Sequence, residues 1–123
     1  MEKKKLIVLA TALVTTLSLT GCIAGFDKFE KAYGSCGSPD GVEVSDGGKT
    51  LSIDTEGDED YSGASFDDFN CILDAVETPQ FVQEQISATS ALMGRQTEEF
   101  DGIEISWSYH PDTGAKLTMH KRD

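Results

Sequence analysis

The sequence contains two histidines, His110 and His120, which are its best candidates for metal binding or proton transfer. Both fall in the two C-terminal strands that the sequence predicts, so the pairing of those strands decides whether they can act together. The expected pairing has two apolar contacts, Trp107 with Met119 and Tyr109 with Leu117. It sets His120 opposite Ser106 and places His110 about 13 Å further along, at about 3.3 Å per residue. Ligands of one zinc ion lie about 2 Å from it, so we expect no metal site and at most a His120–Ser106 hydrogen bond.

Trp107, Tyr109 and His110 form the most distinctive run of side chains and could provide a surface for a ligand. The alternative is that Ile103, Ile105, Trp107 and Tyr109 form the inward face of a strand, because these apolar residues alternate with polar ones. The alternation is uninterrupted. We therefore favour a core position for Trp107 and keep the ligand surface as the alternative.

The acidic run from Asp54 to Asp60 could supply oxygen ligands for calcium. An EF-hand loop that began at Asp54 would need glycine at position 59 and glutamate at position 65, whereas this chain has Glu59 and Ser65. We expect a solvated charged loop, with weak calcium binding as the alternative.

The N-terminal residues are typical of an export signal. Lys3 to Lys5 precede an apolar run over residues 6–19, and Leu19-Thr20-Gly21-Cys22 closes it. This sequence resembles the lipobox of bacterial lipoprotein signal peptides. In that family the signal is cleaved before the cysteine, whose sulfur carries a diacylglyceryl group. The resemblance implies a mature protein that begins at Cys22 and is held by its lipid at the outer face of the cytoplasmic membrane. The alternative is a membrane-spanning helix, but about 15 apolar residues fall short of the roughly 20 that a span needs.

Two cysteines, Cys36 and Cys71, remain once Cys22 is acylated. An even pair in a small domain outside the cytoplasm favours one disulfide. The bond would close a loop of about 36 residues, which is worth about 4 kcal/mol if the stabilisation comes from chain entropy.

Charge excludes some classes of partner. The chain has 10 basic and 22 acidic residues, and residues 1–21 hold three of the basic and one of the acidic ones. The remainder has seven basic and 21 acidic residues, a net charge of −14. Such a surface repels nucleic acids and anionic lipids. We expect a signal peptide over 1–21, a tether over 22–35 that can form a short helix, and one small domain over 36–123.

The domain begins with a predicted hairpin in which Val42 faces Ile53 and Val44 faces Leu51. A helix should begin after Ser65 as N-cap, and its apolar stripe would be Phe66, Phe69, Leu73 and Val76. A second helix should have Thr78 as its N-cap and Pro79 as its first residue, and it should end at Gly94. Its inner face would be Phe81, Val82, Ile86, Thr89, Leu92 and Met93.

Three more strands should complete the fold. The segments 96–100 and 103–109 would pair across Asp101-Gly102, with Glu99 facing Glu104, and 116–120 would follow. The order β-β-α-α-β-β-β predicts an α+β fold, with an antiparallel sheet of about five strands and two helices packed on one face.

A second resemblance concerns residues 36–120. The segments that carry it are Cys36, Cys71-Ile72-Leu73, Thr78-Pro79, Gly94-Arg95-Gln96 and Trp107-Ser108-Tyr109-His110-Pro111-Asp112-Thr113-Gly114. They are similar to a group of small exported actinobacterial proteins, and this resemblance brings no activity with it.

No serine in the sequence has the Gly-x-Ser-x-Gly context of a nucleophile elbow. We expect no enzymatic activity and no cofactor. The favoured function is an interaction or ligand-binding module of the cell envelope, bound to the membrane through the lipid on Cys22 and to an envelope protein partner. The alternatives are a small envelope enzyme with an unrecognised carboxylate site and a purely structural accessory of another exported protein.

Overall fold

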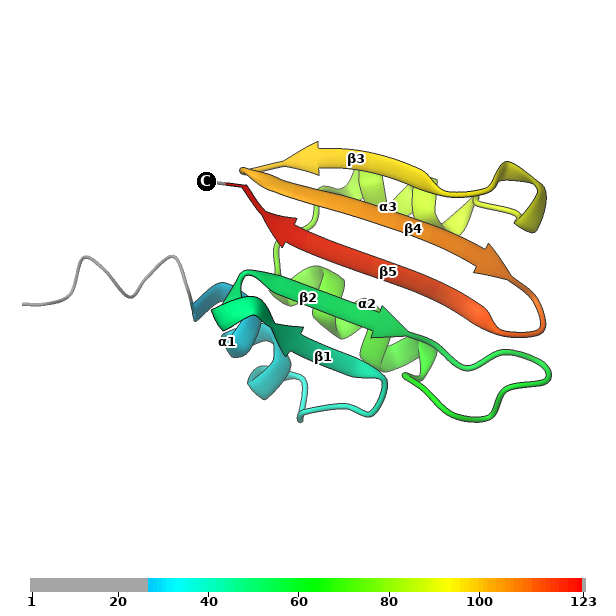
Figure 1. Cartoon of the computed structure of the whole chain (residues 1–123), viewed down its shortest axis with the longest axis horizontal. Helices are drawn as coiled ribbons and strands as arrows, with labels where there is room; N and C mark the ends of the chain where they lie inside the picture. Colours follow the sequence, from blue (N-terminus) through cyan, green and yellow to red (C-terminus); the bar gives the residue numbers. More distant parts are fainter. Residues whose placement is uncertain (1–26, 123) are drawn as a thin grey trace, which may run out of the picture.

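The computed structural model describes residues 27–122 of the chain. The predicted signal peptide and the predicted lipidation site, Cys22, lie outside the described residues. Figure 1 shows a sheet with helices packed behind it. The elements in chain order are α1 (Asp27–Ser35), β1 (Val42–Ser45), the 3₁₀ turn η1 (Asp46–Gly48), β2 (Thr50–Asp54), α2 (Phe66–Ala75), α3 (Gln80–Ser87), the 3₁₀ turn η2 (Ala91–Met93), β3 (Gln96–Phe100), β4 (Ile103–His110) and β5 (Gly114–Lys121).

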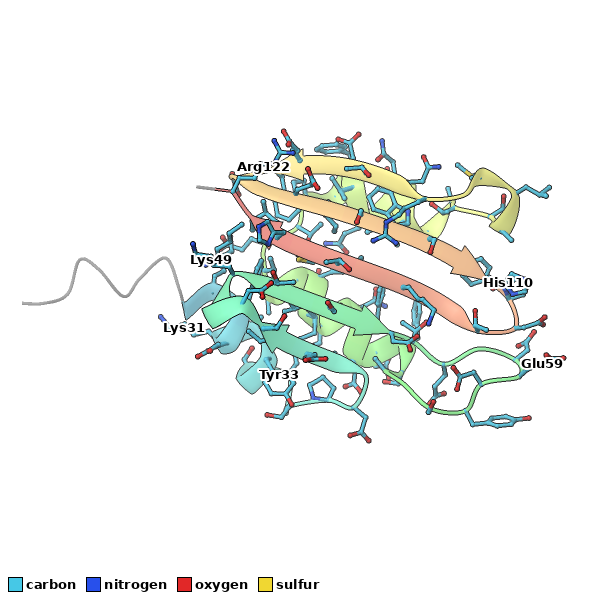
Figure 2. The ribbon with its side chains drawn as sticks, viewed as in Figure 1. Lys31, Tyr33, Lys49, Glu59, His110 and Arg122 are labelled. Carbon is cyan, nitrogen blue, oxygen red and sulfur yellow. A yellow bond between two sulfur atoms is a disulfide. The ribbon has the colours of Figure 1, made fainter. Side chains whose placement is uncertain are left out.

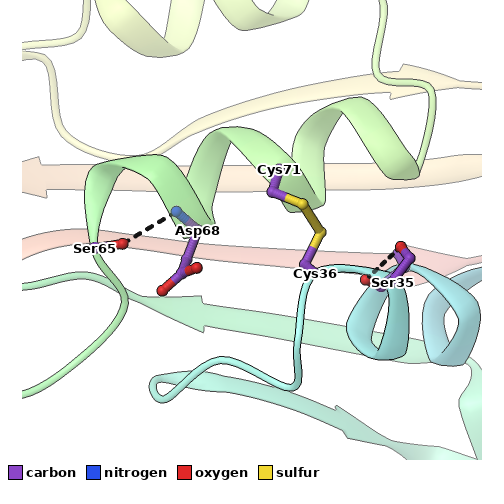
Figure 3. The surroundings of a disulfide bond; sticks show 6 residues. Ser35, Cys36, Ser65, Asp68 and Cys71 are labelled. Atoms are coloured by element: carbon purple, nitrogen blue, oxygen red, sulfur yellow. Dashed lines mark hydrogen bonds between the residues drawn. A yellow bond between two sulfur atoms is a disulfide. The ribbon is translucent and has the colours of Figure 1, made fainter.

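The strands form one antiparallel sheet in the order β1-β2-β5-β4-β3. The C-terminal strand β5 lies at its centre, between the hairpin β1–β2 and the hairpin β3–β4. The predicted α+β class and five-stranded antiparallel sheet are confirmed. A third helix, α1, is the short helix that the tether over 22–35 was expected to be able to form, and it packs into the domain through Phe29, which is fully buried. Figure 3 shows α1 and α2 together in front of the strands, so both cover the same face.

The face of the sheet beneath the helices forms the core, because alternate strand residues point toward it. Burying one large apolar side chain of this kind contributes about 1.5–3 kcal/mol. The largest fully buried side chains are Phe29, Leu51, Ile53, Ile72, Leu73, Val76, Val82, Ile105, Trp107, Leu117 and Met119. The predicted core position of Trp107 is therefore confirmed. None of the described helices has both the length and the apolar character that crossing a membrane requires.

Two of the predicted strand registers are confirmed. Val42 faces Ile53 in the first hairpin, as its alternation predicts. Glu99 faces Glu104 in the hairpin β3–β4, which alone would bring two like charges together. Arg122 resolves this repulsion, because its guanidinium lies 3.0 Å from the Glu99 carboxylate and also binds Glu104. The same two carboxylates raise the pKa of Arg122, with Glu104 as the larger cause.

The predicted register of the last hairpin is wrong by two residues. Trp107 faces Leu117 rather than Met119, and Tyr109 faces Ala115. The reason is that β5 begins at Gly114, so the turn is shorter than expected. Side chains repeat with a period of two along a strand, so a shift of two keeps every apolar residue on its predicted face.

The start of α2 agrees with the sequence. Ser65 is its N-cap, and its hydroxyl accepts a hydrogen bond of 3.1 Å from the Asp68 backbone N–H. Cys71 lies on this helix and forms the predicted disulfide with Cys36, which follows α1 (Figure 3). The bond joins α1 to α2 with the two Cα atoms 5.9 Å apart. Phe66, however, is 75% exposed and does not belong to the inner stripe.

The predicted limits of the second helix are wrong at both ends. Pro79, in an extended conformation, is its N-cap in place of Thr78, whose buried hydroxyl has no hydrogen-bond partner in the described structure. The helix ends at Ser87 rather than at Gly94, because the buried Thr89 hydroxyl just beyond it accepts the Trp107 indole N–H, and the chain then turns toward β3. The same hydroxyl donates to the Gln85 carbonyl at 2.7 Å. Leu92 and Met93 of the predicted inner face are therefore exposed, and Phe81, which lies within α3, is exposed as well.

Candidate functional site

A groove of about 550 Å³ lies between α2 and α3, where the two helices meet the ends of β4 and β5. Phe69, Leu73 and Ile86 are buried and form its apolar floor. Phe66 and Tyr109 line it from more exposed positions and form its rim. A concave apolar surface with exposed aromatic side chains at its mouth is typical of a binding site.

Polar groups also line this groove. Glu56, Asn70 and Ser87 contribute a carboxylate, an amide and a hydroxyl from three different segments. None of these side chains forms a hydrogen bond or ion pair with another described residue. By contrast, the Gln83 amide is held by the Asp74 carboxylate and by a backbone carbonyl. Three of the polar groups in the groove are therefore available to a ligand.

The loop 55–64 sets the position of Glu56 beside the rim. The Glu56 N–H donates to the Ala64 carbonyl at 3.1 Å, and the Ala64 N–H donates to the Asp54 carbonyl at 2.8 Å. These bonds bring the end of β2 against the start of α2. Gly63 makes this approach possible, because its φ is +120° and a Cβ there would lie 2.6 Å from the Asp54 carbonyl oxygen.

The same loop is joined to the turn between β4 and β5. The Thr55 N–H donates to the Ala115 carbonyl at 2.9 Å, and the Ala115 N–H donates to the Thr55 hydroxyl at 2.7 Å. Further out, the Asp58 N–H donates to the Pro111 carbonyl at 2.9 Å. These three hydrogen bonds therefore hold this end of the groove in place.

Trp107 supports the opposite wall without lining the groove. Its indole N–H donates to the Thr89 hydroxyl at 2.8 Å, and both side chains are buried. Thr89 lies just beyond the end of α3, near Ile86 and Ser87, which face the groove. The Trp107–Thr89 bond therefore fixes the end of α3 against the sheet.

The structure divides the predicted ligand surface of Trp107, Tyr109 and His110. Tyr109 lines the groove, Trp107 lies behind it, and His110 lies on the other face of β4. The His110 Nδ1 accepts a hydrogen bond of 3.1 Å from the Asp112 N–H. Figure 2 shows His110 at the same end of the molecule as Glu59, close to the turn between β4 and β5.

The predicted His120–Ser106 pair does not form, because the corrected register sets His120 opposite Glu104. The His120 Nδ1 lies 2.9 Å from the Thr50 hydroxyl, which donates to the Asp46 carboxylate at 2.7 Å. The Thr50 proton is thus directed to Asp46, and Nδ1 must be the donor toward Thr50. In a serine or threonine nucleophile the hydroxyl donates its proton to the histidine base. Here the hydroxyl of Thr50 donates to Asp46 instead, so His120 does not activate it as a nucleophile.

In the acidic loop that could bind calcium, the Asp60 carboxylate is already engaged by a neighbouring residue. The Asp60 carboxylate accepts hydrogen bonds from the hydroxyl and the backbone N–H of Ser62. These bonds, the hydroxyl bond first, lower the pKa of Asp60. Within residues 27–122, no three side chains from histidine, cysteine, aspartate and glutamate converge as metal ligands.

Comparisons with protein families, with curated proteins and with solved structures find no match to this chain.

Proposed function

We propose that this protein is a lipid-anchored binding module of the cell envelope, and that the groove between α2 and α3 holds its ligand. The observation that carries the proposal is the combination of an apolar floor, the exposed Phe66 and three unpaired polar side chains in one groove. Exposed aromatic side chains cost solvation free energy that a bound ligand recovers.

The place of the groove in the molecule fits a membrane anchor at Cys22. Helix α1 begins at Asp27, five residues after Cys22, and an extended chain of this length reaches at most about 18 Å. Figure 1 shows the start of α1 at one end of the sheet and the loop 55–64 at the other. A lipid on Cys22 would therefore hold the α1 end near the membrane and leave the groove facing away from it.

We propose binding without catalysis. Glu56 is the one carboxylate among the residues that line the groove, and none of them is a histidine. General acid–base catalysis needs a proton donor or acceptor with a suitable pKa at the reacting atom, commonly with a second group to complete the transfer. The remaining free polar groups, the Asn70 amide and the Ser87 hydroxyl, are suited to hydrogen bonding with a ligand.

Photo-crosslinking in cells that produce the full-length chain tests this proposal. A photoreactive phenylalanine analogue at position 66 should give a specific adduct, because that side chain lies at the rim. The same analogue at position 81 is the matched control, since Phe81 is also an exposed phenylalanine but does not line the groove. Identical adducts at the two positions, or none at position 66, would contradict the proposal.

A further inference from the structure

The charged residues that line the groove or follow in its bordering loop are acidic. Glu56 lines it, and none of the lining residues is a lysine or an arginine. Asp58 and Glu59 follow in the loop that borders the groove, and both are exposed. Lys116, the basic residue closest in sequence to the lining residue Ala115, is directed to the other face of the sheet, where it lies 3.5 Å from the Asp54 carboxylate. The groove therefore opens into a negative potential, which attracts cations and repels anions.

The aromatic side chains near the groove favour the same kind of partner. Phe66 and Tyr109 line it, and Tyr61 on the bordering loop is 87% exposed. The face of an aromatic ring attracts a lysine or arginine cation placed over it. The rings also provide apolar area, so they can contact both the charge and the hydrocarbon part of one side chain.

The open form of the groove favours a protein segment over an enclosed small molecule. Sites for small molecules usually enclose most of their ligand, whereas this groove is open at its rim, where Phe66 is 75% exposed to solvent. Asn70 on α2 and Ser87 on α3 offer an amide and a hydroxyl from the two sides. Both groups can bond to the N–H and C=O groups of a peptide backbone.

We infer that the groove binds a segment of a partner protein in which apolar side chains are flanked by lysine or arginine. The apolar side chains would occupy the floor formed by Phe69, Leu73 and Ile86, and a flanking cation would face Glu56. This inference rests on the proposed binding role of the groove and adds the chemical class of its ligand.

The test uses the full-length lipidated protein in nanodiscs of zwitterionic lipid, which do not attract cationic peptides by charge. The probe is an array of 12-residue peptides built from leucine, phenylalanine and tyrosine, in three matched series that carry lysine, glutamine or glutamate at the flanking positions. We expect the lysine series to bind about tenfold more tightly than the glutamine series at low salt, and the glutamate series to bind least. Raising the salt concentration should reduce this difference, because exposed charges are screened.

Two variants of equal charge change assign the effect to the groove. Glu56→Gln should lower the preference for lysine over glutamine about threefold, as expected for one partly exposed ion pair. Glu43→Gln is the control, since Glu43 is exposed on β1 and points to the face of the sheet opposite the helices. It should leave the preference unchanged.

Equal binding of the lysine and glutamine series would overturn the inference while leaving the groove as a binding site. An equal effect of the two variants would also overturn it, because the preference would then reflect net charge alone. If no series binds, the inference is wrong, and a specific adduct at position 66 would still support a ligand that is not a peptide. If neither peptide binding nor an adduct at position 66 is found, the proposed binding function is refuted.

Discussion

The substitution Thr89→Val should weaken the connection between the end of α3 and the sheet. The Thr89 hydroxyl accepts the indole N–H of Trp107 and donates to the Gln85 carbonyl. Valine has nearly the same shape, so the change removes both bonds without opening a cavity. The indole N–H is then left without a partner in a position where Trp107 is only 2% exposed.

The size of the effect follows from that buried donor. Leaving a buried hydrogen-bond donor unsatisfied costs about 1–3 kcal/mol, so we expect a loss of about 2 kcal/mol in the free energy of unfolding. A small domain has about 5–15 kcal/mol in total, and the variant should therefore still fold. With a urea dependence of about 1–3 kcal/mol per molar, the midpoint should fall by roughly 0.7–2 M.

A double-mutant cycle separates this bond from other effects. Trp107→Phe keeps a buried ring but has no N–H to leave unsatisfied. In that background Thr89→Val should cost at least about 1 kcal/mol less, within the range of coupling between residues in contact. Circular dichroism should follow the urea melts, because Trp107 is the single tryptophan and its fluorescence is lost in two of the four proteins.

The cycle also has outcomes that would refute the reasoning. If the two substitutions are additive, the Trp107–Thr89 bond contributes no coupling, and the end of α3 is held by apolar packing alone. If Thr89→Val leaves the midpoint unchanged, the indole N–H has found another partner. The variant should also reduce the adduct yield at position 66, because Ile86 and Ser87 on α3 line the groove. An unchanged yield would show that the groove does not depend on this bond.

Three further predictions concern the cysteines and the acidic loop. Replacing Cys36 and Cys71 by serine should lower the free energy of unfolding by about 4 kcal/mol, which urea melts measure, and alkylation of both thiols in the native, unreduced protein would contradict the disulfide. Cys22→Ser should abolish incorporation of a labelled fatty acid and leave the chain unprocessed, whereas detection of an unmodified Cys22 thiol in the membrane-bound mature protein would refute lipidation. Ser62→Ala should raise the pKa of Asp60 toward 3.8, because the hydrogen bond from the Ser62 hydroxyl is the largest cause of its lowering and is lost in the variant. Since the pKa of Asp60 is lower in the folded state, its stabilising contribution is present above the unfolded pKa and is lost as the pH falls through the folded pKa; a carboxyl NMR titration that shows no change in Ser62→Ala would refute this cause.

Local patterns predicted the elements whose determinants lie close together in the sequence. The alternation of Val42 and Val44 fixed the first hairpin, and the Ser65 cap fixed the start of α2. The registers of β1–β2 and β3–β4 followed because each is set by a short turn and an apolar pattern of period two. The register of β4–β5 could not be predicted in the same way, because a shift of two residues leaves the apolar pattern unchanged. The strand β5 also begins earlier than expected, at Gly114.

The end of α3 depended on a contact that no local pattern contains. The apolar spacing continued through Leu92 and Met93, which favoured a helix up to Gly94. The helix ends at Ser87 because Thr89 is engaged by Trp107, which is 18 residues further along the chain. Tertiary contacts of this kind commonly override a local helical preference.

The groove could not be predicted from the sequence, because it also depends on contacts between distant segments. Exposure alone does not reveal it, because Phe66 and Phe81 are both exposed apolar side chains at predicted core positions, yet only Phe66 lines the groove. What distinguishes Phe66 is that it lines the groove together with Glu56 from the preceding loop and Ser87 from α3. The Ala64–Asp54 backbone bond brings the loop there, and Trp107 holds the end of α3. The groove therefore forms only when both hairpins pair with β5 in the sheet. Because Phe66 is 75% exposed, substitutions there should change binding with little effect on folding, whereas substitutions at the buried supports Trp107 and Thr89 should change both.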